Sequence, residues 1–205
     1  MFESGAGATF AKMQKLVEAR LPIAHGGFTV MAFGEAGDRF PHIVLRGERS
    51  PASGPVDVRI HSECMTGDVF GSLRCDCGAQ LDAALAHIGE HGGLLVYLRQ
   101  EGRGIGIVEK LKAYNLQDEG LDTFAANTAL GHPEDGRDYA PAAEILVSLG
   151  VTRVRLLTNN PEKVLGLRSC GVDVESRLPI EAGKNPENDA YLRAKKVLSG
   201  HFLAD

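Results

Sequence analysis

The sequence predicts an α+β protein, in which a β-rich N-terminal third is followed by a mixed α/β segment, as a single compact domain over residues 1–205. The first observation is a series of short runs rich in β-branched and aromatic residues, separated by turn residues, at 28–33, 42–46 and 56–61. The second is that apolar, strand-like runs alternate with stretches of helical spacing after residue 78. The third is the composition, since 43% hydrophobic and 24% charged residues are typical of one globular domain.

The predicted elements begin with a helix at 10–20, whose apolar residues have helical spacing and which Pro22 ends. We expect residues 1–11 to be disordered. The three β-rich runs predict an antiparallel sheet or a small barrel, and the loop at 48–55 is interpreted as flexible, without separating two domains. The elements predicted after these are a helix at 79–90, a strand at 94–98, a glycine-rich loop at 102–106, helices at 107–118, 121–130 and 140–149, a strand at 153–157, a helix from Pro161 to about Cys170, a strand near 172–176 and a helix near 188–199.

The charge and hydropathy of the chain exclude some classes of partner. The net charge is −5, from 22 Lys and Arg against 27 Asp and Glu, so the chain lacks the broad basic field that binds a nucleic acid polymer. No run approaches the roughly 20 apolar residues that span a bilayer, and the N-terminal segment has no secretion signal. We therefore expect a cytoplasmic protein with no membrane partner. A small phosphorylated ligand, which needs only a local basic pocket, remains compatible.

The four cysteines are not spaced like a disulfide framework, because three of them crowd into one short segment. Thiolates bind zinc tightly, and Cys64, Cys75 and Cys77 would leave a fourth position for water, as in catalytic zinc sites. The alternative is three incidental buried thiols. Cys170 is interpreted as a buried structural thiol at a helix end rather than as a fourth ligand.

Glu63 precedes the first cysteine of this cluster and is a candidate for proton transfer in zinc-assisted hydrolysis. A solvated carboxylate at a strand end would look the same in the sequence. Zinc deaminases pair an H-x-E segment with a P-C-x-x-C segment, and the second of these is absent here. The deaminase class is therefore excluded.

Two segments have the features of anion sites. RQEGRGIG at 99–106 follows an apolar strand and opens a helix, so its backbone N–H groups can face a phosphate. It has no Walker A lysine, and Ile107 stands where a dinucleotide-binding motif needs its third glycine. The second segment is 156–163, where Asn160 caps a new helix with Thr158 and Lys163 nearby. A structural glycine-rich turn and an ordinary capped helix are the alternatives.

A third segment, 131–139, is crowded with ionisable groups. Asp135 and Arg137 lie two residues apart beside Gly136, so one loop can aim both side chains at a ligand. A solvated turn would show the same pattern.

Taken together, five segments resemble the GTP cyclohydrolase II family in order and in spacing. They are RIHSEC (59–64), TGDVFGSLRCDCG (66–78), RQEGRGIG (99–106), LKAYNLQDEGLDT (111–123) and RLLTNNPEK (155–163), and the resemblance spans about residues 12–198. It implies a fold of that family's type and the conversion of GTP to 2,5-diamino-6-ribosylamino-4(3H)-pyrimidinone 5′-phosphate, formate and pyrophosphate, the first step of riboflavin biosynthesis. It also implies one Zn²⁺ per subunit, Mg²⁺ with the GTP phosphates, and a homodimer.

The resemblance assigns roles residue by residue. It implies zinc on Cys64, Cys75 and Cys77, Asp135 as proton acceptor, Arg137 as nucleophile and Tyr114 as the active-site tyrosine. The residues that it implies for GTP binding are Arg59, Ile60, His61, Ser62, Glu63, Gln80, Glu101, Gly102, Arg103, Thr123, Thr158 and Lys163.

Several alternatives stay open at this point. A guanidinium is effectively always protonated, so Arg137 is a poor nucleophile, and an electrostatic clamp on the α-phosphate is the milder alternative. The chain also departs from the family's usual pattern at Ala125, where relatives carry glutamate, and at His132, where they carry phenylalanine. The alternative functions are a variant that stops at the formylated pyrimidine or serves another pathway, and a non-catalytic nucleotide-binding homologue.

Overall fold

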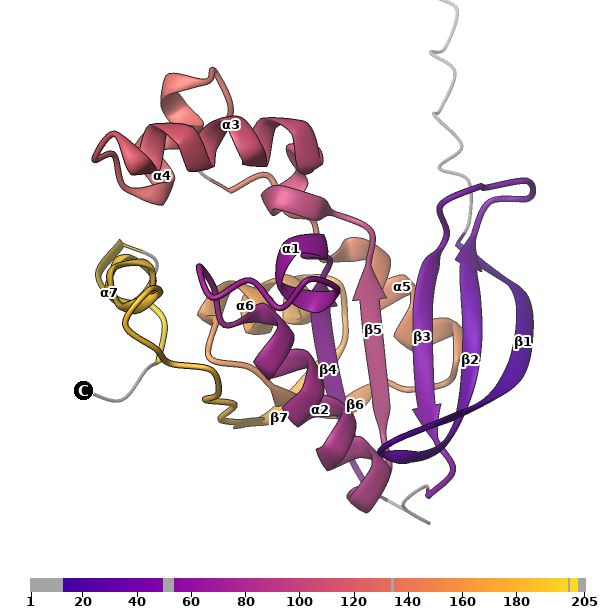
Figure 1. Ribbon diagram of the computed structural model, residues 1–205. Helices are drawn as coiled ribbons and strands as arrows, with labels where there is room; N and C mark the ends of the chain where they lie inside the picture. The colour runs from indigo at the N-terminus through magenta and orange to yellow at the C-terminus, as the bar shows by residue number, and fades with distance from the viewer. Residues whose placement is uncertain (1–12, 50–53, 134, 199, 203–205) are drawn as a thin grey trace, which may run out of the picture.

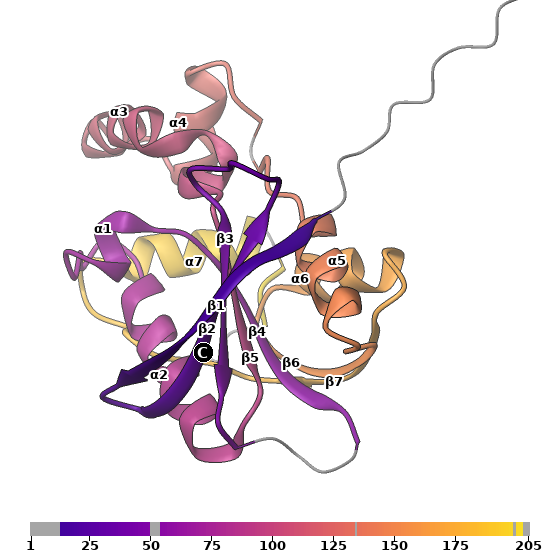
Figure 2. The same ribbon diagram turned by 90° about the vertical axis from the view of Figure 1, so that its right-hand side faces the viewer.

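The computed structural model describes residues 13–49, 54–133, 135–198 and 200–202, and these are built around one mixed sheet with helices on both faces (Figures 1 and 2). The strand order is β1-β2-β3-β5-β4-β6-β7. The strands are β1 (Gln14–Ile23), β2 (Gly26–Gly34), β3 (His42–Gly47), β4 (Val56–Ser62), β5 (Leu94–Leu98), β6 (Arg153–Leu157) and β7 (Asp173–Leu178).

The sheet has an antiparallel part and a parallel part. Strands β1, β2, β3 and β5 pair antiparallel, whereas β4 pairs parallel with both β5 and β6, and β6 pairs parallel with β7. The predicted antiparallel sheet is therefore right for β2 and β3 but wrong for β4, and the predicted barrel is wrong, since β1 and β7 are open edges of the described sheet. A crossover joins β3 to β4 across the position of β5, so turn signals alone did not reveal the pairing.

Helices pack on both faces of this sheet. They are α1 (Met65–Asp68), α2 (Cys77–His91), α3 (Gly106–Asp118), α4 (Thr123–Ala129), α5 (Ala140–Ser148), α6 (Pro161–Ser169) and α7 (Asp189–Leu198), with a short 3₁₀ turn, η1, at Glu101–Gly104. Figure 2 shows α2 and α7 on one face and α5 and α6 on the other, while α3 and α4 stand beyond the end of β5. None of the helices within the described ranges has the length and hydropathy of a membrane span.

Each face of the sheet has its own apolar core. On one face Ile145, Leu146 and Leu167 of α5 and α6 pack on the central strands, and on the other Ala84 and Ile88 of α2 pack on the sheet. Burying these side chains removes apolar surface from water, which is the main favourable term in folding. One sheet with both faces covered confirms the prediction of an α+β protein with a single compact domain.

The predicted helix at 10–20 is wrong. Residues from Gln14 onward form β1, which pairs along its length with β2 through a tight turn near His25. The strand is mostly exposed, and Val17 is 62% accessible. The apolar residues whose spacing predicted a helix are therefore not buried against a core as an amphipathic helix would require. Backbone hydrogen bonds to β2 decide the conformation, with a bulge between Lys15 and Val17. Residues 10–12, and the prediction of disorder for 1–11, lie outside the described residues.

Most of the remaining predicted elements are confirmed. The helix from Pro161 has the predicted cap, in which the Asn160 side chain accepts from the backbone N–H of Glu162 at 2.9 Å. Cys170 corrects one prediction, because it is exposed at the end of α6 rather than buried. The chain turns at Gly171 with a φ of +84°, and that turn leaves the Cys170 thiol at the surface. Residues 50–53 of the loop predicted at 48–55 are outside the described ranges.

A substitution in α2 tests the close packing of this helix on the β1–β2 turn. Alanine is ordinarily about 1 kcal/mol better than glycine in a helix. A Cβ at Gly89, however, would collide with the backbone carbonyl oxygen of His25. We expect Gly89→Ala to lower the free energy of unfolding by about 1–3 kcal/mol, since backbone must move to make room.

Urea denaturation measures this free energy, and Glu90→Ala is the matched control. Glu90 is the next residue of α2 and its side chain is 72% exposed, so its replacement should change stability by less than about 0.5 kcal/mol. An unchanged or higher denaturation midpoint for Gly89→Ala would show that α2 does not approach the turn this closely.

Candidate active site

The site lies at the carboxyl ends of the parallel strands. Strand β4 sits between β5 and β6, and the connections that follow β4 and β5 run over opposite faces, so the ends of these strands open a crevice. One cavity occupies this position, and sixteen of the eighteen residues predicted for the site line it. They are Arg59, His61, Ser62, Glu63, Cys64, Cys75, Cys77, Gln80, Glu101, Gly102, Arg103, Tyr114, Thr123, Arg137, Thr158 and Lys163.

The two other predicted residues lie behind this lining. Ile60 is fully buried in β4, and its carbonyl oxygen accepts from Lys163 Nζ at 2.8 Å. Asp135 accepts from the guanidinium of Arg137, which does line the cavity. Each of the two therefore holds a lining residue in place by accepting a hydrogen bond from it.

The three cysteines of the predicted metal site come together. Cys64 follows β4, while Cys75 and Cys77 lie at the start of α2, and their sulfur atoms are all within 4.8 Å of one another. The Sγ atoms of Cys64 and Cys75 are 3.7 Å apart. Two sulfurs of a tetrahedral zinc site, each about 2.3 Å from the metal, lie about 3.8 Å apart, so the cluster fits Zn²⁺. Gly67 is needed here, since a Cβ would sit 2.9 Å from the Cys75 sulfur.

The charges of these thiols also favour a cation. Hydrogen bonds from the other two thiols lower the pKa of Cys64, so this residue holds the thiolate. The hydrogen bond to that thiolate raises the pKa of Cys75 to about 11, and the same contact raises that of Cys77. All three thiols ionise together only when a cation neutralises them.

Lys110 supplies one positive charge beside the cluster. Its Nζ lies 3.0 Å from the Cys64 sulfur and 2.8 Å from Glu101 Oε1. Burial lowers the pKa of Lys110, but the Cys64 thiolate and Glu101 outweigh burial, and the net pKa is raised. Lys110 is thus a permanent cation beside the cysteine cluster.

A buried carboxylate fixes the backbone at the first cysteine. Asp68 accepts from the Cys64 backbone N–H at 3.0 Å and from the Tyr97 hydroxyl at 2.8 Å. The His61 Nε2 also lies 3.0 Å from Asp68, and the His61 and Tyr97 rings stack at 5.4 Å. Burial lowers the pKa of His61, so the ring is neutral and donates to the carboxylate. This network sets the position of Cys64 relative to β4 and β5.

Helix α3 brings a tyrosine over the cysteines. The Tyr114 hydroxyl is 3.2 Å from Thr66 Oγ1, which lies 3.6 Å from the Cys64 sulfur. Burial raises the pKa of Tyr114, so its phenol stays protonated at neutral pH and can donate to a ligand. The guanidinium of Arg74 lies 4.9 Å from the ring centre.

The glycine-rich turn is tied to the loop that carries Asp135 and Arg137. Arg103 has a φ of 62°, the one positive value of a non-glycine among the described residues, and its guanidinium lies 4.3 Å from the Phe124 ring centre. Its carbonyl oxygen accepts from Gly136 N at 3.1 Å. This strained geometry persists because neighbouring contacts hold it, as is common at functional sites.

Asp135 holds Arg137 in an ion pair. The Arg137 Nε lies 2.8 Å from Asp135 Oδ1, and Arg137 Nη2 donates to the second carboxylate oxygen. Burial raises the pKa of Asp135, but the hydrogen bond from Arg137 outweighs it and the net pKa is lowered. Burial lowers the pKa of Arg137, and the Asp135 contact more than reverses that effect. The pair is therefore fully ionised, with the guanidinium facing the cavity.

Positive charge dominates the cavity as a whole. Seven Lys and Arg side chains line its described part against two carboxylates, in a chain whose net charge is −5. Burial and the nearby Arg59 and Arg137 lower the pKa of Lys163 well below its usual value, and burial lowers that of Arg59 to about 10. Such a concentration of cations suits a ligand with several negative charges.

Five cationic or aromatic residues of the lining were missed by the sequence analysis: Arg74, Lys110, Tyr191, Lys195 and His201. Helical spacing would have found one of them, because Lys110 lies one turn before Tyr114 on the same face of α3. For Lys195 and His201 no local pattern marks the site, since the chain returns to the cavity only in three dimensions.

Thr123 begins α4, whose N-cap is Asp122, so the predicted ligand and a structural cap are neighbours.

Comparisons with known proteins identify the family of the chain. The family model described as GTP cyclohydrolase II matches residues 14–179. A riboflavin biosynthesis protein RibBA of Chlorobium phaeovibrioides is 50% identical over 194 residues, which cover 94% of this chain and 47% of that protein. The RibBA protein of Thermotoga maritima is 50% identical over 193 residues, covering 94% of this chain and 49% of that protein.

The chain thus spans about half the length of the curated relatives that it matches. Among solved structures, the chain is similar to RibBX, a two-domain 3,4-dihydroxy-2-butanone 4-phosphate synthase from A. baumannii. The match has 19% identity and a TM-score of 0.45, and it covers 83% of this chain and 41% of the RibBX chain. The residues matched by the family model contain every strand of the described sheet and the whole cysteine cluster. The chain belongs to the GTP cyclohydrolase II family.

Proposed function

We propose that the chain hydrolyses GTP to 2,5-diamino-6-ribosylamino-4(3H)-pyrimidinone 5′-phosphate, formate and pyrophosphate, with Zn²⁺ on Cys64, Cys75 and Cys77. The observation that carries the proposal is the position of these three thiols in the same cavity as seven cationic side chains. A purine nucleoside triphosphate has an imidazole ring that can be hydrolysed and phosphates that carry negative charge. The thiols can hold a metal ion for the hydrolysis, and the cationic side chains can bind the phosphates. The names of the relatives place them in riboflavin biosynthesis, and we propose the same pathway here.

The cysteine end of the cavity would open the ring. Water adds at C8 of the base, and a second water releases that carbon as formate. Bound zinc lowers the pKa of a coordinated water toward about 7 and so supplies a nucleophile at neutral pH. Asp68 fixes Cys64 through its backbone N–H, and Tyr114 keeps a protonated hydroxyl beside Thr66 that can donate to a developing negative charge.

The cationic end of the cavity would release pyrophosphate. A further water or the enzyme attacks the α-phosphorus, and negative charge grows on the departing pyrophosphate. Arg103, Arg137 and Lys163 line this region and can neutralise that charge together with Mg²⁺ on the phosphates. Asp135 keeps Arg137 protonated, which supports a clamp on the α-phosphate over attack by the guanidinium.

We propose that the other predicted residues bind GTP through the same cavity: Arg59, Ile60, His61, Ser62, Glu63, Gln80, Glu101, Gly102, Thr123 and Thr158. We also propose a homodimer. The segment between α1 and α2 exposes Val69, Phe70 and Leu73 by 61% or more, which supports a protein contact there.

The function is tested by incubating zinc-loaded protein with GTP and Mg²⁺ and measuring formate, pyrophosphate and the pyrimidine separately by mass spectrometry. We expect all three products in equal amounts. A formylated pyrimidine with pyrophosphate would indicate the variant that stops early. GTP left intact by a folded, zinc-containing protein would contradict the proposal and indicate a nucleotide-binding homologue.

Removal of one thiol should affect formate production far more than pyrophosphate release. We expect Cys75→Ser to lose zinc and to lower formate production by at least about a hundredfold, while some pyrophosphate release remains. Metal content by mass spectrometry and the two product assays measure this. Cys170→Ser is the matched control, because Cys170 is exposed at the end of α6 and should change neither. Unchanged formate production by the zinc-free variant would overturn the metal assignment.

Arg137 variants distinguish a clamp from a nucleophile. Arg137→Lys keeps the positive charge but loses the paired donors, so a clamp should lose about ten- to a hundredfold of pyrophosphate release. Arg137→Gln should lose more. Rapid quench of the native protein with labelled GTP tests the alternative directly, since a guanylyl adduct on the protein would establish nucleophilic attack and reject the clamp.

A further inference from the structure

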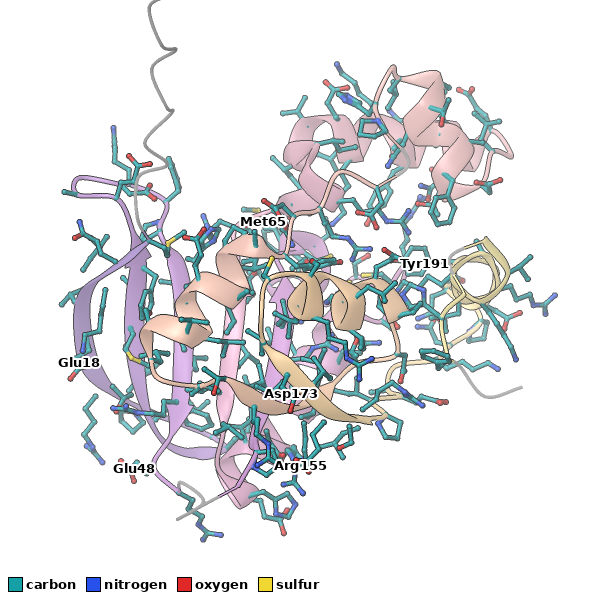
Figure 3. All side chains as sticks on the ribbon, turned by 180° about the vertical axis from the view of Figure 1, so that it is seen from behind. Glu18, Glu48, Met65, Arg155, Asp173 and Tyr191 are labelled. Atoms are coloured by element: carbon teal, nitrogen blue, oxygen red, sulfur yellow. The ribbon has the colours of Figure 1, made fainter. Side chains whose placement is uncertain are left out.

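The C-terminal segment Asn188–Phe202, as far as it is described, forms one wall of the cavity. It contains α7 and lies beyond residues 14–179, which match the family model. Figure 1 shows α7 beside the body of the molecule on the side of α2, and Figure 3 places Tyr191 on the side of α7 that faces that body. Tyr191, Lys195 and His201 line the same cavity as the cysteines and Arg137.

Contacts at two places hold this segment against the site. Lys195 Nζ lies 2.7 Å from Asp76 Oδ1, and Asp76 is a buried residue between two of the cysteines. At the other end, the Phe202 backbone N–H donates to the carbonyl oxygen of Asn159 at 2.9 Å, and the Arg177 guanidinium lies 4.8 Å from the Phe202 ring centre. The side chains of the segment that face the cavity are therefore held in place.

One of these side chains has a buried polar atom without a partner. The Nδ1 of His201 has no hydrogen-bond partner among the described residues, and in the tautomer that carries the proton on this nitrogen the ring can donate to an anion. A lysine has three N–H donors, and within the described residues Lys195 donates one hydrogen bond, to Asp76. A buried donor without a partner costs free energy that a bound acceptor recovers.

The surroundings of His201 define the chemistry of that acceptor. Burial, together with the positive charges of Lys195, Arg137 and Lys163, lowers the pKa of His201 to about 4. Lys163 itself has a backbone carbonyl as its hydrogen-bond acceptor. These cationic side chains come from three elements: Lys163 from α6, Lys195 from α7 and Arg137 from the loop before α5. One ligand with several anionic oxygens can accept hydrogen bonds from all three.

We propose that the C-terminal segment is part of the substrate site, in which Lys195 and His201 bind the phosphates of the nucleotide beside Arg137 and Lys163. This inference rests on the proposed function for the identity of the nucleotide. It assigns to α7 a direct role in binding the triphosphate, in addition to its contact with Asp76.

The test is binding of inorganic triphosphate, with guanosine as the uncharged comparison, measured by isothermal titration calorimetry on the zinc-loaded full chain. We expect the native protein to bind triphosphate, and Lys195→Gln and His201→Gln each to weaken this binding by about tenfold or more, because the first removes a positive charge and the second removes the imidazole from its place beside the anion. Guanosine affinity should stay within about twofold, since these variants leave the rest of the cavity intact.

Arg193→Gln is the matched control on the same helix. Arg193 is 78% exposed and pairs with Asp189 one turn away, so losing its charge should leave triphosphate affinity unchanged. Lys195→Gln keeps an N–H donor for Asp76, and His201→Gln breaks no side-chain hydrogen bond within the described part of the chain, so one of the two variants remains informative if the other unfolds.

Three results would overturn the inference: no triphosphate binding by the native protein, equal binding by native protein and both variants, or an equal loss of guanosine and triphosphate affinity. The last would show that the segment only supports the wall of the cavity. Because triphosphate has no purine ring, the binding result stands even if the formate assay fails, and the two proposals can fail separately.

Discussion

The parallel pairing of β4 with both β5 and β6 is the constraint on which the site depends. It brings the ends of three strands to one edge, so that residues from distant parts of the chain share a cavity. Cys64 follows the first of these strands, Glu101 the second and Thr158 the third. Asp68 then fixes the first of these ends by accepting from the Cys64 backbone, from His61 and from Tyr97. The strand order thus determines the position of the site in the fold, and the buried carboxylate of Asp68 determines the local geometry around Cys64.

The cavity concentrates positive charge that the protein alone does not neutralise. Arg137 has Asp135 and Lys195 has Asp76, but Lys163 donates to a backbone carbonyl. Burying cations in this way costs free energy, which the two apolar cores of the sheet offset. A site assembled at that cost is already organised for a polyanion, so little rearrangement is needed when a triphosphate enters. In the same cavity, the thiols repel one another once they are ionised, and a metal cation would remove that repulsion.

Two predictions from the sequence failed, each for its own physical reason. The segment at 10–20 has helical spacing, yet pairing with β2 makes it a strand, because hydrogen bonds to a neighbouring strand outweigh a weak local preference. Cys170 stands at the end of α6 and was expected to be buried, yet the turn at Gly171 leaves it at the surface. The first failure comes from a contact with another strand, and the second from the direction in which the chain leaves the helix.

The sequence by itself determined which chemical groups are present and how they are grouped along the chain. The C-x10-C-x-C spacing, the glycine-rich turn after a strand and the capped helix at Asn160 are local patterns, and each has the predicted local geometry because it depends on neighbouring residues. Only the tertiary structure decided which distant groups face them. Lys195 and His201 line the cavity, and Lys195 meets the carboxylate of Asp76, the N-cap residue of α2, 119 residues away. No short-range pattern encodes such a contact, since it depends on the packing of the whole sheet and its helices.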